Sequence, residues 1–228
     1  PMSPAPGSTD PLSSLLTDAV KLSSAEISDA LDALRLPGSV SGVGHVAGRR
    51  RLFGRAFTVR YAPVDTMSPG TVGDYLDETP EGAVVVLDNA GRTDCTVWGG
   101  ILSQMAAHRR IGGTVIHGVC RDTAEAEQVG YPLFACGRFM RTGKDRVQVE
   151  EVGGVVSLGD VRVSAGDFVV ADEDGVVVVP QARAAEVFDR AMLLRQAEER
   201  IVAATLCGAS LRDARREASY HTLQRAAA

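Results

Sequence analysis

Two adjacent residues of opposite charge, Arg121 and Asp122, directly follow the apolar run GTVIHGVC. This run predicts a buried strand that ends at the charged pair. A guanidinium holds carboxylates and oxyanions through paired donors, and a carboxylate is a hard oxygen ligand for Mg²⁺ or Mn²⁺. The pair can therefore hold an anionic substrate and a divalent cation. The structural alternative is that both residues form the N-terminal cap of the next helix, where they are paired with each other or solvated.

A second feature that favours anions lies upstream, in the stretch Trp98-Gly99-Gly100-Ile101-Leu102. We expect it at the start of a helix, where backbone N–H groups have no intrahelical acceptor and the helix dipole attracts negative charge. Glycines leave these N–H groups open, although tight packing also demands glycine. A backbone anion cradle, a guanidinium and a metal-binding carboxylate together suit a small keto acid.

Alternating strands and helices must position these residues. Apolar runs predict three buried strands that end in polar residues, at 81–91, 113–122 and 131–137. Helical patterns fill the two intervals between them, the first closed by Gly112 and Gly113. Because ligands of open α/β sheets bind beyond the carboxyl ends of strands, the sequence predicts the site at this edge.

Three further regions complete the predicted α/β layered fold. A first helix at 23–36 has Ser24 as its expected N-cap, and a strand or bent strand pair follows at 51–64. Residues 147–180 form a β-rich block in which Asp172-Glu173-Asp174-Gly175 is expected to be a turn, because it lacks the spacing of a calcium loop. Residues 182–218 predict a long amphipathic helical region with a break near Cys207.

Composition excludes several classes of protein. The chain has 228 residues, 45% of them hydrophobic and 23% charged, which suits one large domain with a sizeable core. The net charge of −5 argues against a nucleic-acid partner. No apolar run approaches the ~20 residues that span a bilayer, and the start does not resemble a signal peptide. We expect a cytoplasmic protein without a membrane partner.

The cysteines and histidines do not suggest a metal centre or a disulfide framework. Cys95, Cys120, Cys136 and Cys207 are scattered without CxxC spacing, so reduced thiols are expected. His117 lies in the apolar run before the charged pair, and we expect a packed or hydrogen-bonded histidine there.

Four stretches carry a resemblance to a known family: SAEISDALDAL, WGGILSQMAAHRRIGGTVIHGVCRD, VGYPLFACGR and SAGDFVVADEDGVVVVP. They resemble the family of RraA (regulator of RNase E activity A) and the class II 4-hydroxy-4-methyl-2-oxoglutarate/4-carboxy-4-hydroxy-2-oxoadipate aldolases. The resemblance implies a swivelling β/β/α-type layered core with N- and C-terminal helices, assembled as a homotrimer or homohexamer. We expect a flexible arm at 1–23, the RraA-like domain at 24–208 and a helical tail at 209–228.

The resemblance also implies roles for individual residues. The segment Gly99, Gly100, Ile101 and Leu102 matches the loop whose backbone amides hold the pyruvate carboxylate. Arg121 matches the arginine that contacts substrate, and Asp122 matches the residue that supports the cation, Mg²⁺ or Mn²⁺. A glutamate that reaches in from the neighbouring subunit matches Glu198 or Glu199.

One position departs from the aldolase pattern. The aldolases carry an acidic residue two positions before the loop's terminal leucine, where this chain has Gly100. Asp88 or Asp94 is a candidate replacement, and each is also typical of a turn or cap. This departure argues against aldolase activity on the usual substrates more strongly than it argues against metal binding.

The sequence therefore predicts a divalent-metal-dependent lyase that acts on a small 2-oxo acid through a metal-stabilised enolate. The reaction is retro-aldol cleavage of a 4-hydroxy-2-oxo acid with release of pyruvate, decarboxylation of oxaloacetate, or both. The alternative is a non-catalytic trimeric regulator of the RraA type that binds an RNase or another protein. Asp122 favours the enzyme, because the RraA regulators lack the metal-binding aspartate.

Overall fold

The computed structural model describes residues 16–223 and divides the chain into two compact units. The larger unit is the continuous segment Pro37–Gln181, and the smaller unit joins the N-terminal residues up to Leu36 to the segment from Ala182 onward. Residues 1–15 of the predicted N-terminal arm lie outside the described residues. No helix in the described part of the chain is long and apolar enough to cross a membrane.

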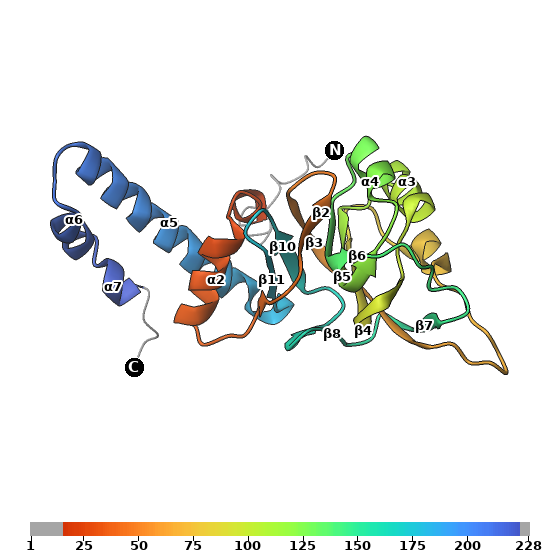
Figure 1. Ribbon diagram of the computed structural model, residues 1–228. Coiled ribbons are helices and arrows are strands. Elements are labelled where there is room, and N and C mark those ends of the chain that lie inside the picture. Colours follow the sequence, from red (N-terminus) through yellow and green to blue (C-terminus); the bar gives the residue numbers. More distant parts are fainter. Residues whose placement is uncertain (1–15, 224–228) are drawn as a thin grey trace, which may run out of the picture. The chain divides into compact units, whose positions relative to one another are not determined.

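The larger unit is built on a mixed nine-stranded sheet (Figure 1). The strand order is β1-β11-β10-β3-β4-β5-β6-β2, and β7 pairs with β3. The strands of this sheet are β1 (Ser39–Val40), β2 (Gly44–Ala47), β3 (Leu52–Pro63), β4 (Val84–Thr96), β5 (Gly113–Cys120), β6 (Leu133–Arg138), β7 (Val147–Val152), β10 (Phe168–Ala171) and β11 (Val176–Val179). A separate hairpin consists of β8 (Val156–Leu158) and β9 (Val161–Val163).

The centre of the sheet is parallel, with β3, β4, β5 and β6 side by side. Helix α3 (Gly100–His108) connects β4 to β5, α4 (Thr123–Gln128) connects β5 to β6, and the two helices pack against each other. A 3-10 helix, η1 (Asp74–Glu78), precedes β4. The carboxyl ends of three adjacent strands thus meet at one edge, and the predicted α/β fold is confirmed.

The apolar runs of the central strands are explained by burial on both faces. Along β4, Val85 and Leu87 enter one core cluster with residues of α3 and α4, while Val84 and Val86 enter a second cluster with the β8–β9 hairpin. All four side chains are fully buried. Because side chains alternate between the faces of a strand, a run without polar residues is what such a strand requires.

The predicted end of β4 is wrong. The run was expected to leave the sheet at Asp88–Gly91, but β4 continues to Thr96 through two shifts of register against β5. The intervening residues bulge out of the ladder, and Asn89 donates a side-chain hydrogen bond to the Cys95 carbonyl across the bulge. The strand therefore delivers Thr96, rather than Asp88, to the site edge.

Two predicted helix boundaries also need correction. The N-cap of α2 (Ser24–Ala33) is Ser23, not Ser24, because Ser23 and Glu26 form a reciprocal capping box. Helix α3 ends before the predicted glycines: Arg110, with φ of 56°, adopts the left-handed conformation that closes it.

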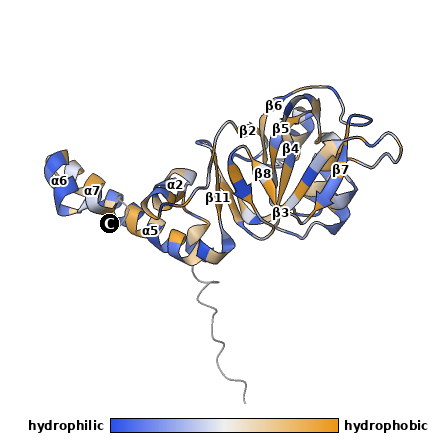
Figure 2. Ribbon diagram, turned by 90° about the horizontal axis from the view of Figure 1, so that it is seen from below, coloured by the Kyte–Doolittle hydropathy of each residue, from blue (hydrophilic) through white to orange (hydrophobic). Residues whose placement is uncertain are grey.

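The smaller unit is helical. It contains α2, α5 (Ala184–Leu206), α6 (Leu211–Glu217) and α7 (Tyr220–Leu223), and η2 (Gln181–Arg183) precedes α5. Figure 2 shows hydrophobic and hydrophilic residues interspersed along α5, whose buried residues include Phe188 and Leu194. The predicted break near Cys207 is confirmed, since α5 ends at Leu206 and Gly208 has φ of 98°.

The structure also confirms the predicted turn before β11. The segment Asp172–Gly175 is a turn between antiparallel strands β10 and β11, with Asp172 and Glu173 close to arginine side chains. All four cysteines are free thiols, and burial raises the pKa of Cys120 to about 12. The Cys120 thiol is therefore neutral at physiological pH and is not an activated nucleophile.

Candidate functional site

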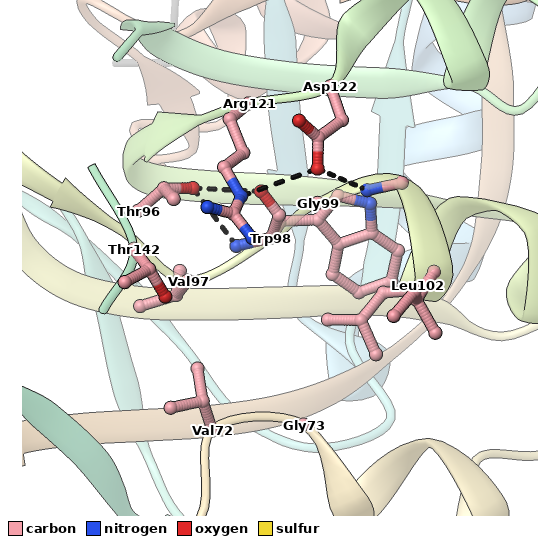
Figure 3. A pocket seen from close by; sticks show the side chains of 12 residues that line it. Val72, Gly73, Thr96, Val97, Trp98, Gly99, Leu102, Arg121, Asp122 and Thr142 are labelled. Carbon is pink, nitrogen blue, oxygen red and sulfur yellow. Dashed lines mark hydrogen bonds and ion pairs between the residues drawn. The ribbon is translucent and has the colours of Figure 1, made fainter. Parts of the chain in front are cut away.

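A pocket of about 280 Å³ lies at the carboxyl edge of the parallel strands (Figure 3). It contains the predicted segment Gly99–Leu102 together with Arg121 and Asp122. The rest of its lining is Val72, Gly73, Thr96, Val97, Trp98 and Thr142. The structure thus brings the predicted backbone cradle and the predicted charged pair into one cavity.

The Asp122 carboxylate joins the two halves of this pocket. Its Oδ2 atom accepts a hydrogen bond of 3.0 Å from the backbone N–H of Gly100 and lies 3.3 Å from Nε of Arg121. Each side chain of the Arg121–Asp122 pair is 39% exposed, so a ligand in the pocket can reach both. Figure 3 shows the two side chains extending from the same strand end toward the glycine segment.

The capping alternative describes the position of Asp122 but not its contacts. Asp122 is the N-cap residue of α4, yet its side chain makes no cap hydrogen bond to that helix. It binds the first N–H of α3 instead. Its backbone is left-handed, with φ of 55°, a conformation that costs a non-glycine residue free energy and that clusters at functional sites. The Asp122 side chain therefore contacts the start of α3 rather than the start of α4.

Both glycines allow this close approach. A Cβ at Gly99 would lie 2.8 Å from Oδ2 of Asp122 and 3.2 Å from Nε of Arg121, which is too close for the present arrangement. A Cβ at Gly100 would lie 3.3 Å from the Cβ of Asp122 and from the Cγ of Glu125. Gly99 is extended rather than left-handed, so close contact, not backbone strain, explains glycine at this position.

The N-terminus of α3 supplies donors for an anion. The first N–H groups of a helix have no intrahelical acceptor. That of Gly100 is bound to Asp122, which leaves those of Ile101 and Leu102 at the pocket. The aligned dipoles of this nine-residue helix also favour negative charge at its N-terminus.

The contacts of Trp98 hold this backbone in place. Trp98 is buried, stacks on Tyr131 with ring centroids 5.8 Å apart, and donates its indole N–H to Oγ of Ser103. The carbonyl oxygen of Trp98 accepts bonds from the Thr96 hydroxyl and from the backbone N–H of Arg121. These contacts tie the end of β4 to the end of β5.

Sequence reasoning missed several residues of the pocket. Thr142 pairs with Thr96 through an isolated bridge, and Val72 and Gly73 come from the loop before η1. No local pattern marks these loop positions.

The two candidate replacements for the acidic residue at position 100 do not line the pocket. Asp94 pairs with Arg92, whose hydrogen bond lowers the pKa of Asp94 to about 2. Asp88 accepts hydrogen bonds from the N–H groups of Ala90 and Ser157 and lies 3.5 Å from Nδ1 of His117. These carboxylates belong to the β4 bulge and its surroundings.

The two candidate glutamates of the long helix lie in the smaller unit. Glu198 accepts a hydrogen bond of 2.8 Å from the Tyr220 hydroxyl, and this bond raises the pKa of Tyr220 to about 12. Glu199 is exposed. A contribution of either residue to a neighbouring subunit's pocket stays a prediction.

Comparison with known proteins identifies relatives that match most of the chain. Protein DlpA of Legionella pneumophila is 36% identical over 93% of this chain, which spans only 35% of the length of DlpA. A protein of Halalkalibacterium halodurans named putative 4-hydroxy-4-methyl-2-oxoglutarate aldolase is 30% identical, with 72% of this chain and 76% of that protein covered.

Solved structures share the fold. An uncharacterized protein from Pseudomonas syringae pv. tomato is 42% identical and has a TM-score of 0.82, with 89% of this chain and 96% of that chain covered. RraAS2 of Streptomyces coelicolor, described as an unusual member of the RNase ES inhibitor RraA protein family, is 27% identical with a TM-score of 0.72. That alignment covers 82% of this chain and 95% of RraAS2.

The family model for RraA-like proteins, described as Aldolase/RraA, matches residues 24–178, which include the whole pocket. The match covers well over half of the sequence. The chain belongs to the RraA-like family.

Proposed function

We propose that this protein is a divalent-metal-dependent carbon–carbon lyase that acts on a small 2-oxo acid and releases pyruvate. The observation that carries the proposal is the meeting of the Gly100 N–H, the Arg121 guanidinium and the Asp122 carboxylate in one pocket. The similarity to a protein named as a putative 4-hydroxy-4-methyl-2-oxoglutarate aldolase supports the reaction class.

The substrate carboxylate binds at the start of α3. The N–H groups of Ile101 and Leu102 donate to its oxygens, and the helix dipole adds a favourable field. Val72, Val97 and Trp98 supply apolar lining, which limits water around the reacting carbons. Arg121 directs its N–H donors at the oxygen on C2.

Asp122 is the proposed ligand of Mg²⁺ or Mn²⁺. The described residues contain no cluster of three or more potential metal-binding side chains. A single carboxylate fits a cation such as Mg²⁺, which binds through one or two carboxylates and completes its shell with water and substrate. When bound, the cation polarises the oxygen on C2 and stabilises the negative charge that develops there.

The reaction breaks the C3–C4 bond. For a 4-hydroxy-2-oxo acid, the C4 hydroxyl gives its proton to water, C4 becomes a carbonyl carbon, and the electrons of the C3–C4 bond form the enolate of pyruvate. Oxaloacetate gives the same enolate with loss of CO₂. Arg121 stabilises the enolate oxygen, and a proton taken up from water at C3 completes pyruvate. Preorganised donors of this kind are commonly worth about 10²–10³ in rate.

We further propose a homotrimer or homohexamer in which Glu198 or Glu199 of a neighbouring subunit completes the site. Both residues lie on the long helix α5, which is amphipathic and leaves Leu193 and Val202 exposed in the single chain. Exposed apolar residues on such a helix are typical of a surface covered on assembly.

A second candidate is a non-catalytic regulator that binds an RNase or another protein. The similarity to RraAS2, described as a member of an RNase inhibitor family, favours it. A regulator does not require Asp122 to face an open pocket, whereas a lyase does.

A pyruvate-release assay separates the two candidates. Oxaloacetate and a panel of 4-hydroxy-2-oxo acids are incubated with the protein, with Mg²⁺ or Mn²⁺ and then with EDTA. The lyase releases pyruvate, loses activity in EDTA and regains it when the cation is restored. Absence of turnover on every acid, together with tight binding to an RNase, supports the regulator.

A further inference from the structure

One wall of the pocket comes from the loop between β3 and η1, residues 64–73. Val72 and Gly73 of this loop line the pocket, and Figure 3 shows them on the side opposite the charged pair. A Cβ at Gly73 would lie 2.9 Å from Cδ2 of Leu102, so the backbone of this wall packs directly against the first turn of α3. The wall therefore borders the backbone donors that are proposed to hold the substrate carboxylate.

A buried tyrosine fixes this wall. Tyr61, on β3, donates a hydrogen bond of 2.6 Å from its hydroxyl to the carbonyl oxygen of Val72. Its hydroxyl oxygen also lies 3.3 Å from that of Tyr75, on η1. Burial raises the pKa of both tyrosines, so their hydroxyls stay protonated at neutral pH and remain hydrogen-bond donors. A side chain of the sheet thus holds the loop at the point where it meets the pocket.

The outer part of the loop has a separate attachment, to β7. Oε1 of Gln148 accepts two hydrogen bonds, of 3.0 Å from the N–H of Asp65 and of 2.9 Å from the N–H of Gly70. The backbone N–H of Val149 donates to the Thr71 carbonyl at 2.9 Å. The outer part of the loop therefore depends on β7, whereas the part at the pocket has its own bond to β3.

We propose that Tyr61 is a positioning residue that sets how tightly the pocket binds its ligand. This inference rests on the proposed function, because it takes the carboxylate of the ligand to bind at the start of α3. By holding the Val72 carbonyl, Tyr61 keeps the wall against Leu102 and thereby keeps the first turn of α3 in place. Tyr61 does not line the pocket and takes no part in bond cleavage.

Hydrogen exchange, followed by mass spectrometry, tests this role without any ligand. Two backbone amides report on the two sides of the contact: the N–H of Leu76 donates to the Gly73 carbonyl, and the N–H of Ser103 donates to the Gly99 carbonyl in the first turn of α3. Tyr61→Phe removes only the hydroxyl. We expect both reporter amides to exchange about two- to tenfold faster in this variant, which is the net worth of a neutral hydrogen bond. Amides in the middle of β5 should keep their rates.

Steady-state kinetics of pyruvate release separate positioning from catalysis. A looser wall weakens the ground state and the transition state alike, so KM should rise about two- to tenfold in Tyr61→Phe while kcat stays within about twofold. Gly73→Ala tests the same wall with Tyr61 intact. Its Cβ displaces the end of the Leu102 side chain and should raise KM in the same way. This variant also keeps the proposal testable if Tyr61→Phe does not fold.

Two variants provide matched controls. Thr58→Val removes a hydroxyl that donates to the Gly154 carbonyl at 2.6 Å, a bond of the same type and length on the opposite face of β3. It should lower the melting temperature as Tyr61→Phe does but leave KM and both reporter amides unchanged. Gln148→Met releases the outer part of the loop and should speed exchange within residues 65–70 only.

The proposal is overturned if Tyr61→Phe leaves the Ser103 amide unchanged, or if Thr58→Val raises KM as much as Tyr61→Phe does. Its failure can be distinguished from failure of the lyase. Pyruvate release with an unchanged KM in Tyr61→Phe removes the role of Tyr61 and leaves the lyase intact. Faster exchange at both reporter amides, in a protein that releases no pyruvate, removes the lyase and leaves Tyr61 as the residue that positions the pocket.

Discussion

The backbone N–H of Gly100 donates a hydrogen bond of 3.0 Å to Oδ2 of Asp122, which lies 22 residues later in the chain. This bond connects the first turn of α3 to the strand end of β5. It leaves the carboxylate facing the same pocket as the Arg121 guanidinium. The consequences of this arrangement can be tested residue by residue.

The two glycines should respond differently to alanine. In Gly99→Ala the new Cβ collides with the Asp122 carboxylate, at 2.8 Å, and displaces it. A misplacement of a catalytic group by about 1 Å can lower the rate by about 10²-fold. In Gly100→Ala the closest approach is 3.3 Å, so small shifts suffice and most activity remains. The measurements are kcat/KM for pyruvate release and the melting temperature of each variant. An equal loss of kcat/KM in both variants would argue against the contact between position 99 and the Asp122 carboxylate.

Arg121→Met should remove the donor to the enolate oxygen. We expect turnover to fall by about 10²–10³. Stability should change by about 0.5 kcal/mol or less, because the side chain is partly exposed and the backbone bond from Arg121 to Trp98 remains. Arg92→Met, which removes an arginine outside the pocket, is the control and should keep its activity. An Arg121→Met variant that melts far earlier yet keeps its specific activity would make the residue structural.

The shared-site model predicts complementation between inactive chains. Asp122→Asn subunits lack the proposed cation ligand, and subunits with both Glu198→Gln and Glu199→Gln lack the glutamate from α5. When the two variants are mixed and reassembled, part of the activity should return. Some interfaces then bring an intact Asp122 from one chain together with the intact glutamates of another chain. The molar mass measured by light scattering should be that of a trimer or a hexamer. A monomer at micromolar concentration, or no recovery after subunit exchange, would rule out the shared site.

Tyr220 should add a pH-dependent contribution to the stability of the helical unit. Its hydrogen bond to Glu198 raises its pKa from 10.0 to about 12. Because the folded-state pKa is the higher one, the contribution is fully present below pH 10 and is lost as the pH rises through about 12. Urea unfolding of wild type and Tyr220→Phe should show a difference in unfolding free energy that narrows over this interval. A difference that stays constant would mean that the bond does not form.

Much of the fold follows from local patterns. The runs at β4 to β6 contain no alternating polar residues, since each strand is buried on both faces, and this predicted three buried strands of an α/β fold. The end of β4 was missed because the bulge after Asp88 depends on pairing with β5, which no local pattern records. The Ser23 cap was missed by one residue, since two serines precede the helix and only the contact with Glu26 distinguishes them.

The charged pair and the glycines of the site were identifiable because they stand at a strand end and a helix start. Thr142 and Val72 were not, since each comes from a loop that reaches the pocket through tertiary packing.

The central claim is that Asp122 holds a catalytic divalent cation, and one comparison tests it most directly. Asp122→Asn keeps an oxygen that can accept the Gly100 N–H but gives up the negative charge. Mn²⁺ binding, followed by electron paramagnetic resonance, and pyruvate release are measured on wild type, Asp122→Asn and the control Asp94→Asn. We predict that wild type and Asp94→Asn bind Mn²⁺ and release pyruvate, while Asp122→Asn folds normally and loses both. If Asp122→Asn binds Mn²⁺ and turns over like wild type, Asp122 is not the cation ligand and the account is contradicted.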